Sequence, residues 1–466
     1  MSRTELDSFG PIEVADSCYW GAQTERSAHY FAIGQEKMPL EVIYALVLIK
    51  KAAARVNSRV GVLSADIARL IEQACDEILQ GKFDEQFPLS LWQTGSGTQS
   101  NMNVNEVIAG RANELSGAAR GGKSPVHPND HVNCSQSTND CFPTAMHIAT
   151  LQRLKEHLLP ALDTLCAGLT ELSDRHKNLI KIGRTHLMEA TPMTFGQEDG
   201  AFVAQLALAK QSIVAAMPAV SELAQGGTAV GTGLNAPRGF GQAMAAELSA
   251  LTGLNLKPSS NTFAALAGHE PLVAMSGAIK TLAVALMKLA NDLRLLNAGP
   301  RSGFAEIMLP ANEPGSSMMP GKVNPTQCEA LAMVICQVFG NDVTIGFAAS
   351  QGQLQLNAYK PVIVYNLLQS IGLLTDGCYS FYNHCVVGLK VNAKRMDAHL
   401  EQSLMLVTAL TPHIGYDKAA HIARQAFAND MTLRQAALDL KYLTDEEFTQ
   451  WVQPAHMLHS GQGAED

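Results

Sequence analysis

The middle of the chain carries a long helical pattern of apolar residues. Leucine recurs every three or four positions from 154 to 172, which places these side chains on one helical face, with a kink expected at Pro160. Apolar stretches with helical spacing also cover residues 195–224, 271–296, 326–347 and 362–389. Five long apolar helices predict a bundle core. Their faces are more apolar than one small bundle needs, which predicts burial partly between chains.

The pattern changes on either side of this bundle. Residues 1–137 combine strand-like pieces with helical patterns at 41–60 and 64–80. Beyond residue 394 the helical patterns are short, and a capping box at Thr444 to Glu447 announces one of them. We predict a mainly α-helical protein with three domains: a mixed, mostly helical domain at 1–137, a central helical bundle at 138–394 and a small helical domain at 395–466.

Charge and cysteine content narrow the class of protein. The net charge of −9 argues against a nucleic-acid partner, which usually requires a basic face. The nine cysteines are odd in number and form no C-x-x-C motif, and the N-terminus has no apolar signal core, so we expect a cytoplasmic location. Lys280 and Lys288 interrupt the apolar stretch 273–290, so we expect a buried bundle helix there and no membrane span.

A polar loop at 315–325 is the most informative chemical feature. Its two glycines and two prolines break regular structure, yet it carries Ser316, Ser317, Lys322 and Asn324. Glycine-rich backbone can direct N–H groups at an anion, and Lys322 adds a full positive charge. A nucleotide-binding P-loop is excluded, because five residues separate the glycines and Val323 follows the lysine. The composition suits a site that holds a carboxylate and stabilises further negative charge on it.

Three further segments share a composition of hydroxyls, amides and glycine. They cover residues 93–103, 127–140 and 183–186. Taken singly, such clusters are more often turns and helix caps, and Ser137 to Asn139 could simply cap the following helical run. Together with the 315–325 loop they predict one polar binding site.

These motifs resemble those of a known superfamily. The string Gly-Ser-Ser-Met-Met-Pro-Gly-Lys-Val-Asn-Pro at 315–325 resembles the signature of the fumarase/aspartase superfamily, whose members form or cleave C–O or C–N bonds beside a carboxylate. All four segments, with 19–24 and 412–420, are similar in order and spacing to class II fumarases across essentially the whole chain. His186 favours the fumarases, because aspartases carry glutamine there, and Gly321 favours them as well.

The resemblance implies an activity and roles for individual residues. It implies reversible, stereospecific hydration of fumarate to (S)-malate in the tricarboxylic acid cycle, through a carbanion (aci-carboxylate) intermediate and without metal or other cofactor. Ser316 would be the base, activated as an alkoxide by backbone N–H groups and Lys322, and His186 would handle the proton of the water or hydroxyl. Glu329 would orient or charge His186. The substrate contacts would be Ser96, Gly97, Thr98, Ser137, Thr138, Asn139, Thr185, Ser317, Lys322, Val323 and Asn324.

The resemblance also implies a second anion site and an assembly. The second site would comprise His127, Pro128, Asn129 and Asp130, although capping of a helix by Asn129 or Asp130 explains these residues equally well. The implied fold is the three-domain fumarase/aspartase-like fold, whose long helices form the core of a homotetramer. Each active site would take residues from three subunits, with His186 and Ser316 on different chains.

Two alternatives remain open from the sequence. The chain could be another lyase of the superfamily, an aspartase or an argininosuccinate lyase. It could also be a non-catalytic scaffold or regulatory protein that keeps the fold, although the presence of Ser316, His186 and Lys322 argues against lost activity. Assay with malate, aspartate and argininosuccinate separates these alternatives.

Overall fold

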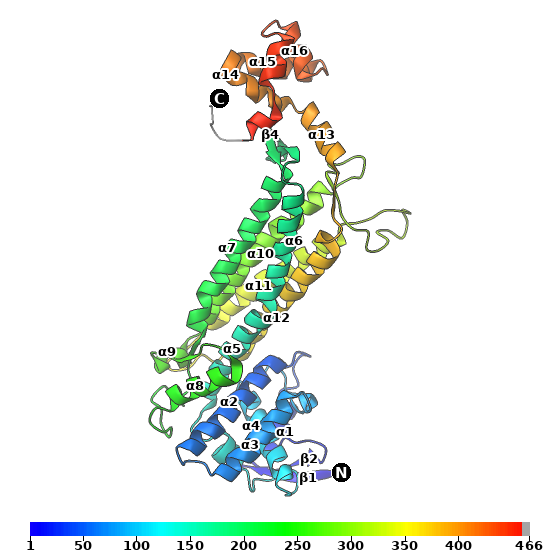
Figure 1. Cartoon of the computed structure of the whole chain (residues 1–466). Helices are drawn as coiled ribbons and strands as arrows, with labels where there is room; N and C mark the ends of the chain where they lie inside the picture. The colour runs from blue at the N-terminus through cyan, green and yellow to red at the C-terminus, as the bar shows by residue number, and fades with distance from the viewer. Residues whose placement is uncertain (459–466) are drawn as a thin grey trace. The chain divides into compact units, whose positions relative to one another are not determined.

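The computed structural model describes residues 1–458, and helices dominate them (Figure 1). The α-helices are α1 (Ala22–Tyr30), α2 (Leu40–Arg59), α3 (Ala65–Leu79), α4 (Thr98–Leu115), α5 (Thr138–Arg153), α6 (Leu159–Arg175), α7 (Phe195–Val220), α8 (Phe240–Thr252), α9 (Thr262–Ala267), α10 (Glu270–Leu296), α11 (Thr326–Ala349), α12 (Lys360–Phe381), α13 (Ala393–Gln402), α14 (Thr411–Ile414), α15 (Tyr416–Ala428), α16 (Leu433–Asp439) and α17 (Asp445–Trp451). Short 3-10 or π segments are η1 (Asp84–Gln86), η2 (Pro128–Val132), η3 (Leu154–Leu158), η4 (Tyr382–Val386), η5 (Leu404–Leu410) and η6 (Pro454–Met457).

Within residues 1–458 the strands form only two-stranded sheets. Three are antiparallel: β1 (Ser2–Asp7) with β2 (Gly10–Ala15), β3 (Ile180–Thr185) with β4 (Met188–Thr194), and β7 (Ile307–Met308) with β8 (Lys390–Val391). The parallel pair joins β5 (Glu222–Leu223) to β6 (Lys257–Pro258). None of these sheets is large enough to form a core, so the helices supply it.

The predicted helices are present, with two corrections at their ends. The leucine face from 154 to 172 is buried, and a π turn, η3, precedes Pro160. The capping box at Thr444 begins α17 as predicted. Helix α7 ends at Val220 instead of 224, because the chain leaves it to pair β5 with β6. Helix α12 ends at Phe381 instead of 389, because the backbone widens into η4 and then becomes extended at Val387.

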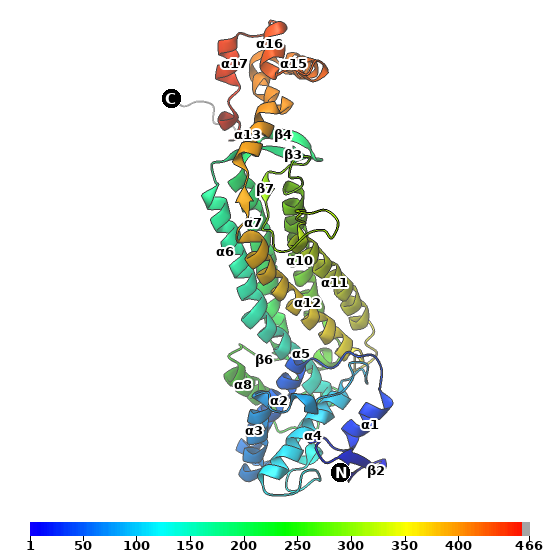
Figure 2. The ribbon, with the colours of Figure 1, turned by 90° about the vertical axis from the view of Figure 1, so that its right-hand side faces the viewer.

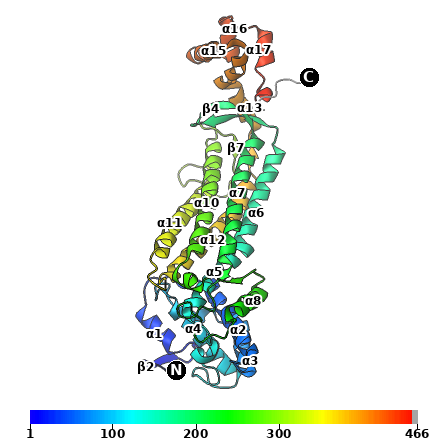
Figure 3. The same ribbon diagram turned by 90° about the vertical axis from the view of Figure 1, so that its left-hand side faces the viewer.

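The chain divides into two compact units. The first unit comprises residues 1–161, 209–284 and 334–376, and the second comprises 162–208, 285–333 and the residues from 377 onward. In the first unit α2, α3 and α8 lie side by side (Figures 1 and 2). In the second unit α13 lies beside β3, next to β4 (Figures 2 and 3). The three-domain division at residues 137 and 394 stays a prediction.

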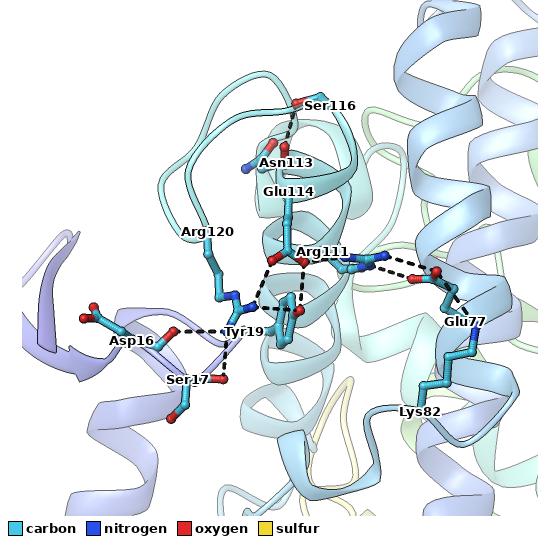
Figure 4. A network of polar contacts seen from close by, with 10 residues as sticks. All are labelled: Asp16, Ser17, Tyr19, Glu77, Lys82, Arg111, Asn113, Glu114, Ser116 and Arg120. Atoms are coloured by element: carbon cyan, nitrogen blue, oxygen red, sulfur yellow. Dashed lines mark hydrogen bonds and ion pairs between the residues drawn. The ribbon is translucent and has the colours of Figure 1, made fainter. Parts of the chain in front are cut away.

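An ion-pair network in the first unit ties the end of α4 to the N-terminal segment (Figure 4). The carboxylate of Glu114 accepts hydrogen bonds from Tyr19 Oη and Arg120 Nη2, each at 2.8 Å, and from Arg111. Arg111 in turn bonds Glu77 on α3. Burial alone would raise the pKa of Glu114, but the hydrogen bonds from Arg120, Tyr19 and Arg111 outweigh it and lower the pKa to about 2. This network therefore holds a carboxylate in its charged form.

Two of the three long apolar helices, α7 and α11, leave most of their apolar surface exposed in the single chain, whereas more than half of the apolar window of α10 is buried. By length and composition alone, α7, α10 and α11 could each cross a membrane. Only 22% of the apolar window of α7 and 28% of that of α11 is buried within the chain. Large apolar side chains are exposed along these helices: Leu208, Val214, Val284, Met333, Val343 and Phe347. The prediction that residues 273–290 form a buried helix holds only in part within one chain, because Val284 is 58% exposed.

Candidate active site

The 93–103 segment folds tightly around the N-terminus of α4. Gly97 is the N-cap residue of α4 with φ 79°, and a side chain there would overlap the ring of Phe142, so only glycine fits. Ser96 Oγ lies 2.8 Å from Thr98 Oγ1. Gln93 Oε1 accepts from both the backbone N–H and the hydroxyl of Ser100, each at 3.0 Å. The two hydroxyls at positions 96 and 98 therefore sit where a helix N-terminus favours negative charge.

The structure brings the 127–140 segment against α4. Thr138 is buried, and its Oγ1 accepts a hydrogen bond of 3.0 Å from Asn101 Nδ2. Asn139 Nδ2 donates to the carbonyl of Ala229 at 2.8 Å. Ser137 caps α5 in a capping box with Asp140, so the capping interpretation of this residue is confirmed. Two of the four predicted segments thus share one polar cluster in the first unit.

Two buried charged residues support this cluster: Lys50, which the sequence analysis missed, and Asp140, which lay in the predicted segment 127–140 without an assigned role. Lys50 Nζ donates to Asn133 Oδ1 at 2.9 Å and to Gln136 Oε1 at 3.1 Å, and burial lowers the pKa of Lys50. Asp140 Oδ2 accepts from the backbone N–H groups of Gly226 and Thr228. Burial raises the pKa of Asp140 despite these hydrogen bonds. For Asp140, the position three residues after Ser137 was a capping-box signal that could have found it.

The residues of the predicted second anion site form the start of η2. His127, not Asn129 or Asp130, makes the cap: its Nδ1 accepts from the backbone N–H of Asn129 at 3.1 Å and of Asp130 at 3.0 Å, so the capping alternative named the wrong residues. Burial lowers the pKa of His127, which suits an accepting, unprotonated nitrogen. Pro128 occupies the first position of η2 and is buried. Binding of an anion here stays a prediction.

In the second unit, His186 lies at the tip of the β3–β4 hairpin. Thr185 pairs with Met188, so His186 and Leu187 form a two-residue turn. Both have positive φ, at 56° and 64°, the geometry of hairpin turns that usually contain asparagine and glycine. Thr185 and His186 are exposed. The hairpin therefore presents the imidazole outward on a backbone that a non-glycine residue adopts only at a cost in energy.

The 315–325 loop is closed at its neck. Gly315 N–H donates to Lys322 O at 2.8 Å, and Asn324 Nδ2 donates to Gly315 O at 2.6 Å. A side chain at Gly315 would overlap the Lys322 carbonyl, which explains this glycine by close backbone approach. Asn324 thus uses one amide proton within the loop and keeps the other, with its carbonyl oxygen, for a ligand. The side chains of Ser317, Lys322 and Val323 are exposed.

Ser316 lies inside this loop in an arrangement suited to negative charge. Its Oγ accepts hydrogen bonds from the backbone N–H groups of Met318 at 3.2 Å and Met319 at 3.0 Å. Two donors directed at one oxygen are what an oxyanion requires. Glu329 lies in the first turn of α11, just beyond the loop. Among the described residues of this single chain, no hydrogen bond or ion pair joins His186 to Ser316 or to Glu329.

Comparison with known proteins places the chain among lyases. Residues 10–340 match the family model described as Lyase, and residues 406–459 match the one described as Fumarase C C-terminus. The chain is 70% identical to the class II fumarate hydratase of Pseudomonas syringae pv. tomato over 461 residues, which cover 99% of each chain. It is 59% identical to that of Thermosynechococcus vestitus, over 98% of each chain. The crystal structure of the class II fumarase from Schistosoma mansoni superposes with a TM-score of 0.97 at 46% identity, covering 98% of this chain and 99% of that one.

Proposed function

Because the chain belongs to the class II fumarate hydratases, hydro-lyases that convert fumarate to malate, we propose that it hydrates fumarate reversibly and stereospecifically to (S)-malate by acid–base catalysis. Its place would be the tricarboxylic acid cycle, in the cytoplasm. The observation that carries the proposed mechanism is the pair of backbone N–H groups on Ser316 Oγ. The fold itself is the mainly helical, long-helix fold of the fumarases.

In the proposed mechanism Ser316 removes the C3 proton of malate. Serine is a poor base at its ordinary pKa, so its alkoxide must be stabilised. The N–H groups of Met318 and Met319 point at this oxygen, and Lys322 adds charge on the same loop. As C3 loses its proton, electron density moves into the neighbouring carboxylate and forms a dianionic aci-carboxylate. Lys322 and Asn324 would hold that carboxylate where the charge accumulates.

His186 would protonate the hydroxide that leaves C2, since imidazole titrates near neutral pH. Glu329 would orient His186 across the site. The hydroxyl and amide groups of Ser96, Thr98, Thr138, Asn139 and Thr185 would bind the substrate by neutral hydrogen bonds, and the remaining contacts would come from Gly97, Ser137, Ser317 and Val323. The residues His127, Pro128, Asn129 and Asp130 would form the second anion site.

The proposed assembly is a homotetramer with shared active sites. The exposed apolar side chains of α7, α10 and α11 would be buried by the same helices of other subunits, since exposed apolar surface of this extent marks an interface. Within the described residues of one chain, no hydrogen bond joins His186 to Ser316. This is the arrangement expected if each active site takes His186 from one subunit and Ser316 from another.

Absorbance of fumarate tests the proposed reaction directly. Purified protein supplied with malate is expected to produce the ultraviolet absorbance of the conjugated diacid. Aspartate and argininosuccinate serve as parallel substrates, because aspartases and argininosuccinate lyases would release fumarate from them. Turnover of aspartate or argininosuccinate in preference to malate would replace the proposed reaction by that of a sister lyase. Lack of turnover on all three would favour the scaffold alternative.

Activity is expected to survive removal of metal ions. Hydroxyls and amides dominate the proposed site, which adds only one lysine, one histidine and the carboxylate of Glu329, and among the described residues no three His, Cys, Asp or Glu side chains gather as metal ligands would. The prediction is full activity after prolonged treatment with a chelator and exposure to air, measured as fumarate absorbance against an untreated sample. Loss of activity that added iron restores would overturn the metal-free proposal.

The 315–325 loop is expected to be mobile until a dicarboxylate binds. Gly315 and Gly321 flank the loop and are its expected hinges, but the structure leaves only one of them suited to that role: Gly315 is packed into the closed neck, while Gly321 is exposed with φ 80°. We expect the loop to move as a closed unit, as lids that exclude water do. Hydrogen exchange of its backbone amides should slow when malate binds. Equal exchange rates with and without malate would count against a gating role.

A further inference from the structure

The second unit contains a buried charge cluster centred on Glu306. This side chain is 0% exposed, and Arg184 Nη2 lies 2.6 Å from its Oε1. Lys181 Nζ, also buried, lies 2.8 Å from Oε2 and 2.5 Å from Glu198. His399 Nδ1 lies 3.0 Å from Oε1 and 3.3 Å from Arg184 Nη2. One carboxylate thus meets side chains from β3 and α13.

The backbone holds Glu306 as firmly as its side chain does. Its N–H donates to Leu296 O at 3.0 Å, and its C=O accepts from Asn392 N–H at 2.8 Å. Burial alone would raise the pKa of Glu306, but the charge of Lys181 and the hydrogen bonds of Arg184 and His399 outweigh it and lower the pKa below its ordinary value. Glu306 is therefore a fixed, charged acceptor rather than a group that exchanges protons near neutral pH.

The two basic side chains that contact Glu306 from β3, Lys181 and Arg184, belong to the hairpin whose turn contains His186. Lys181 and Arg184 are strand residues, and Arg184 directly precedes Thr185 and His186. The register of the hairpin shifts between Ile182 and Arg184, so Arg184 lies directly after a bulge on the tip side of the strand. The guanidinium of Arg184 also lies over the ring of Phe304, 4.3 Å from its centroid.

The tip of this hairpin needs such an anchor. The positive φ values of His186 and Leu187 are unfavourable for residues other than glycine, and such strain persists only where the surrounding structure imposes it. A second anchor acts on β4, where Ser403 Oγ donates to Glu189 Oε2 at 2.8 Å. Ile182 packs into the core of the C-terminal helices together with Leu410 and Ile422.

We propose that Glu306 is a positioning residue for catalysis, which fixes the strained hairpin carrying Thr185 and His186 through Lys181 and Arg184. This inference rests on the proposed role of His186 in the hydration of fumarate. A shift of about 1 Å in a reacting group can cost about 10²-fold in rate, so loss of the anchor has a large expected effect although Glu306 touches no substrate.

The test is Glu306→Gln, which keeps the shape of the side chain and removes its charge. The matched control is Glu114→Gln, since Glu114 also accepts hydrogen bonds from two arginines and a third donor, but in the ion-pair network of the first unit. We expect Glu306→Gln to lower kcat for malate by about 10²-fold and Glu114→Gln to leave kcat unchanged. Equal losses in both variants, or none in Glu306→Gln, would overturn the proposal.

Two further readouts separate positioning from general destabilisation. Hydrogen exchange of the amides at 180–194 should accelerate in Glu306→Gln and not in Glu114→Gln, and this readout does not depend on activity. In a His186→Asn background, Glu306→Gln should add little further loss, because residues that act as a unit are not additive. Fully additive losses, or unchanged exchange in the hairpin, would show that Glu306 does not act through His186.

A second variant covers the case in which Glu306→Gln does not fold. Arg184→Lys keeps a positive charge beside Glu306 but loses the guanidinium hydrogen bond and the stacking on Phe304. It should show the same pattern of lower kcat and faster hairpin exchange, and wild-type behaviour in both would overturn the proposal. If the wild-type protein fails to turn over malate, the proposed function falls, whereas the exchange measurements still decide the role of Glu306.

Discussion

Replacing Ser316 by alanine is expected to lower kcat for malate by at least about 10²-fold, because removing a positioned base costs roughly 10²–10⁴ in rate. The structure gives this expectation a physical basis, since two backbone N–H groups already point at Ser316 Oγ. His186→Asn is expected to show a loss of similar size, because asparagine cannot transfer a proton near neutral pH. The measurement is the rate of fumarate formation under saturating malate, with the fold checked by circular dichroism.

Two controls make this result specific. His157→Asn replaces an exposed histidine on η3 by the same residue and should retain the wild-type kcat. Because Ser316 also accepts two backbone hydrogen bonds, Ser316→Ala could disturb the loop, so binding of the unreactive dicarboxylate succinate should be compared with wild type. Nearly unchanged succinate affinity with a lost kcat indicates a missing base. Wild-type turnover by Ser316→Ala would show that this serine is not the base.

The long helices could be predicted from the sequence because their signal is local. Six leucines repeat with helical spacing, and each of them is buried as that spacing requires: Leu154, Leu158, Leu162, Leu165, Leu169 and Leu172. The predicted ends of α7 and α12 were wrong because tertiary structure decides where these two helices stop. The strand that follows α7 pairs with Lys257 and Pro258, more than thirty positions further along the chain, and no local pattern announces such a pairing.

The candidate site was predictable only in part, for a similar reason. The hydroxyls and amides of the four segments stood out by composition, and Ser316 gained the backbone donors expected of it. Lys50 and Glu306 escaped notice because each is a single charged residue whose partners lie far away in the sequence. A buried ion pair leaves no periodic signature, so only the folded chain reveals which charges support the site.

Mixing two inactive variants is expected to restore activity if the active sites are shared between chains. His186→Asn retains Ser316, and Ser316→Ala retains His186. Consider a site that takes His186 from one subunit and Ser316 from another. It is intact when the subunit that supplies His186 is the Ser316→Ala variant and the subunit that supplies Ser316 is the His186→Asn variant. In randomly mixed tetramers each condition holds with a probability of about one half, so about a quarter of the sites should recover. The physical motive is the exposed apolar surface of α7 and α11, which requires partner helices, together with the lack of any bond between His186 and Ser316 in the described part of one chain.

The experiment is to unfold both variants together, refold them and assay fumarate formation against each variant refolded alone. Two different affinity tags on the variants would prove that mixed tetramers form, and wild-type protein taken through the same cycle gives the full activity. Recovery near a quarter of that value would place His186 and Ser316 on different subunits of one site. If mixed tetramers form but remain as inactive as the separate variants, both residues must come from one chain, and the shared-site arrangement would have to be abandoned.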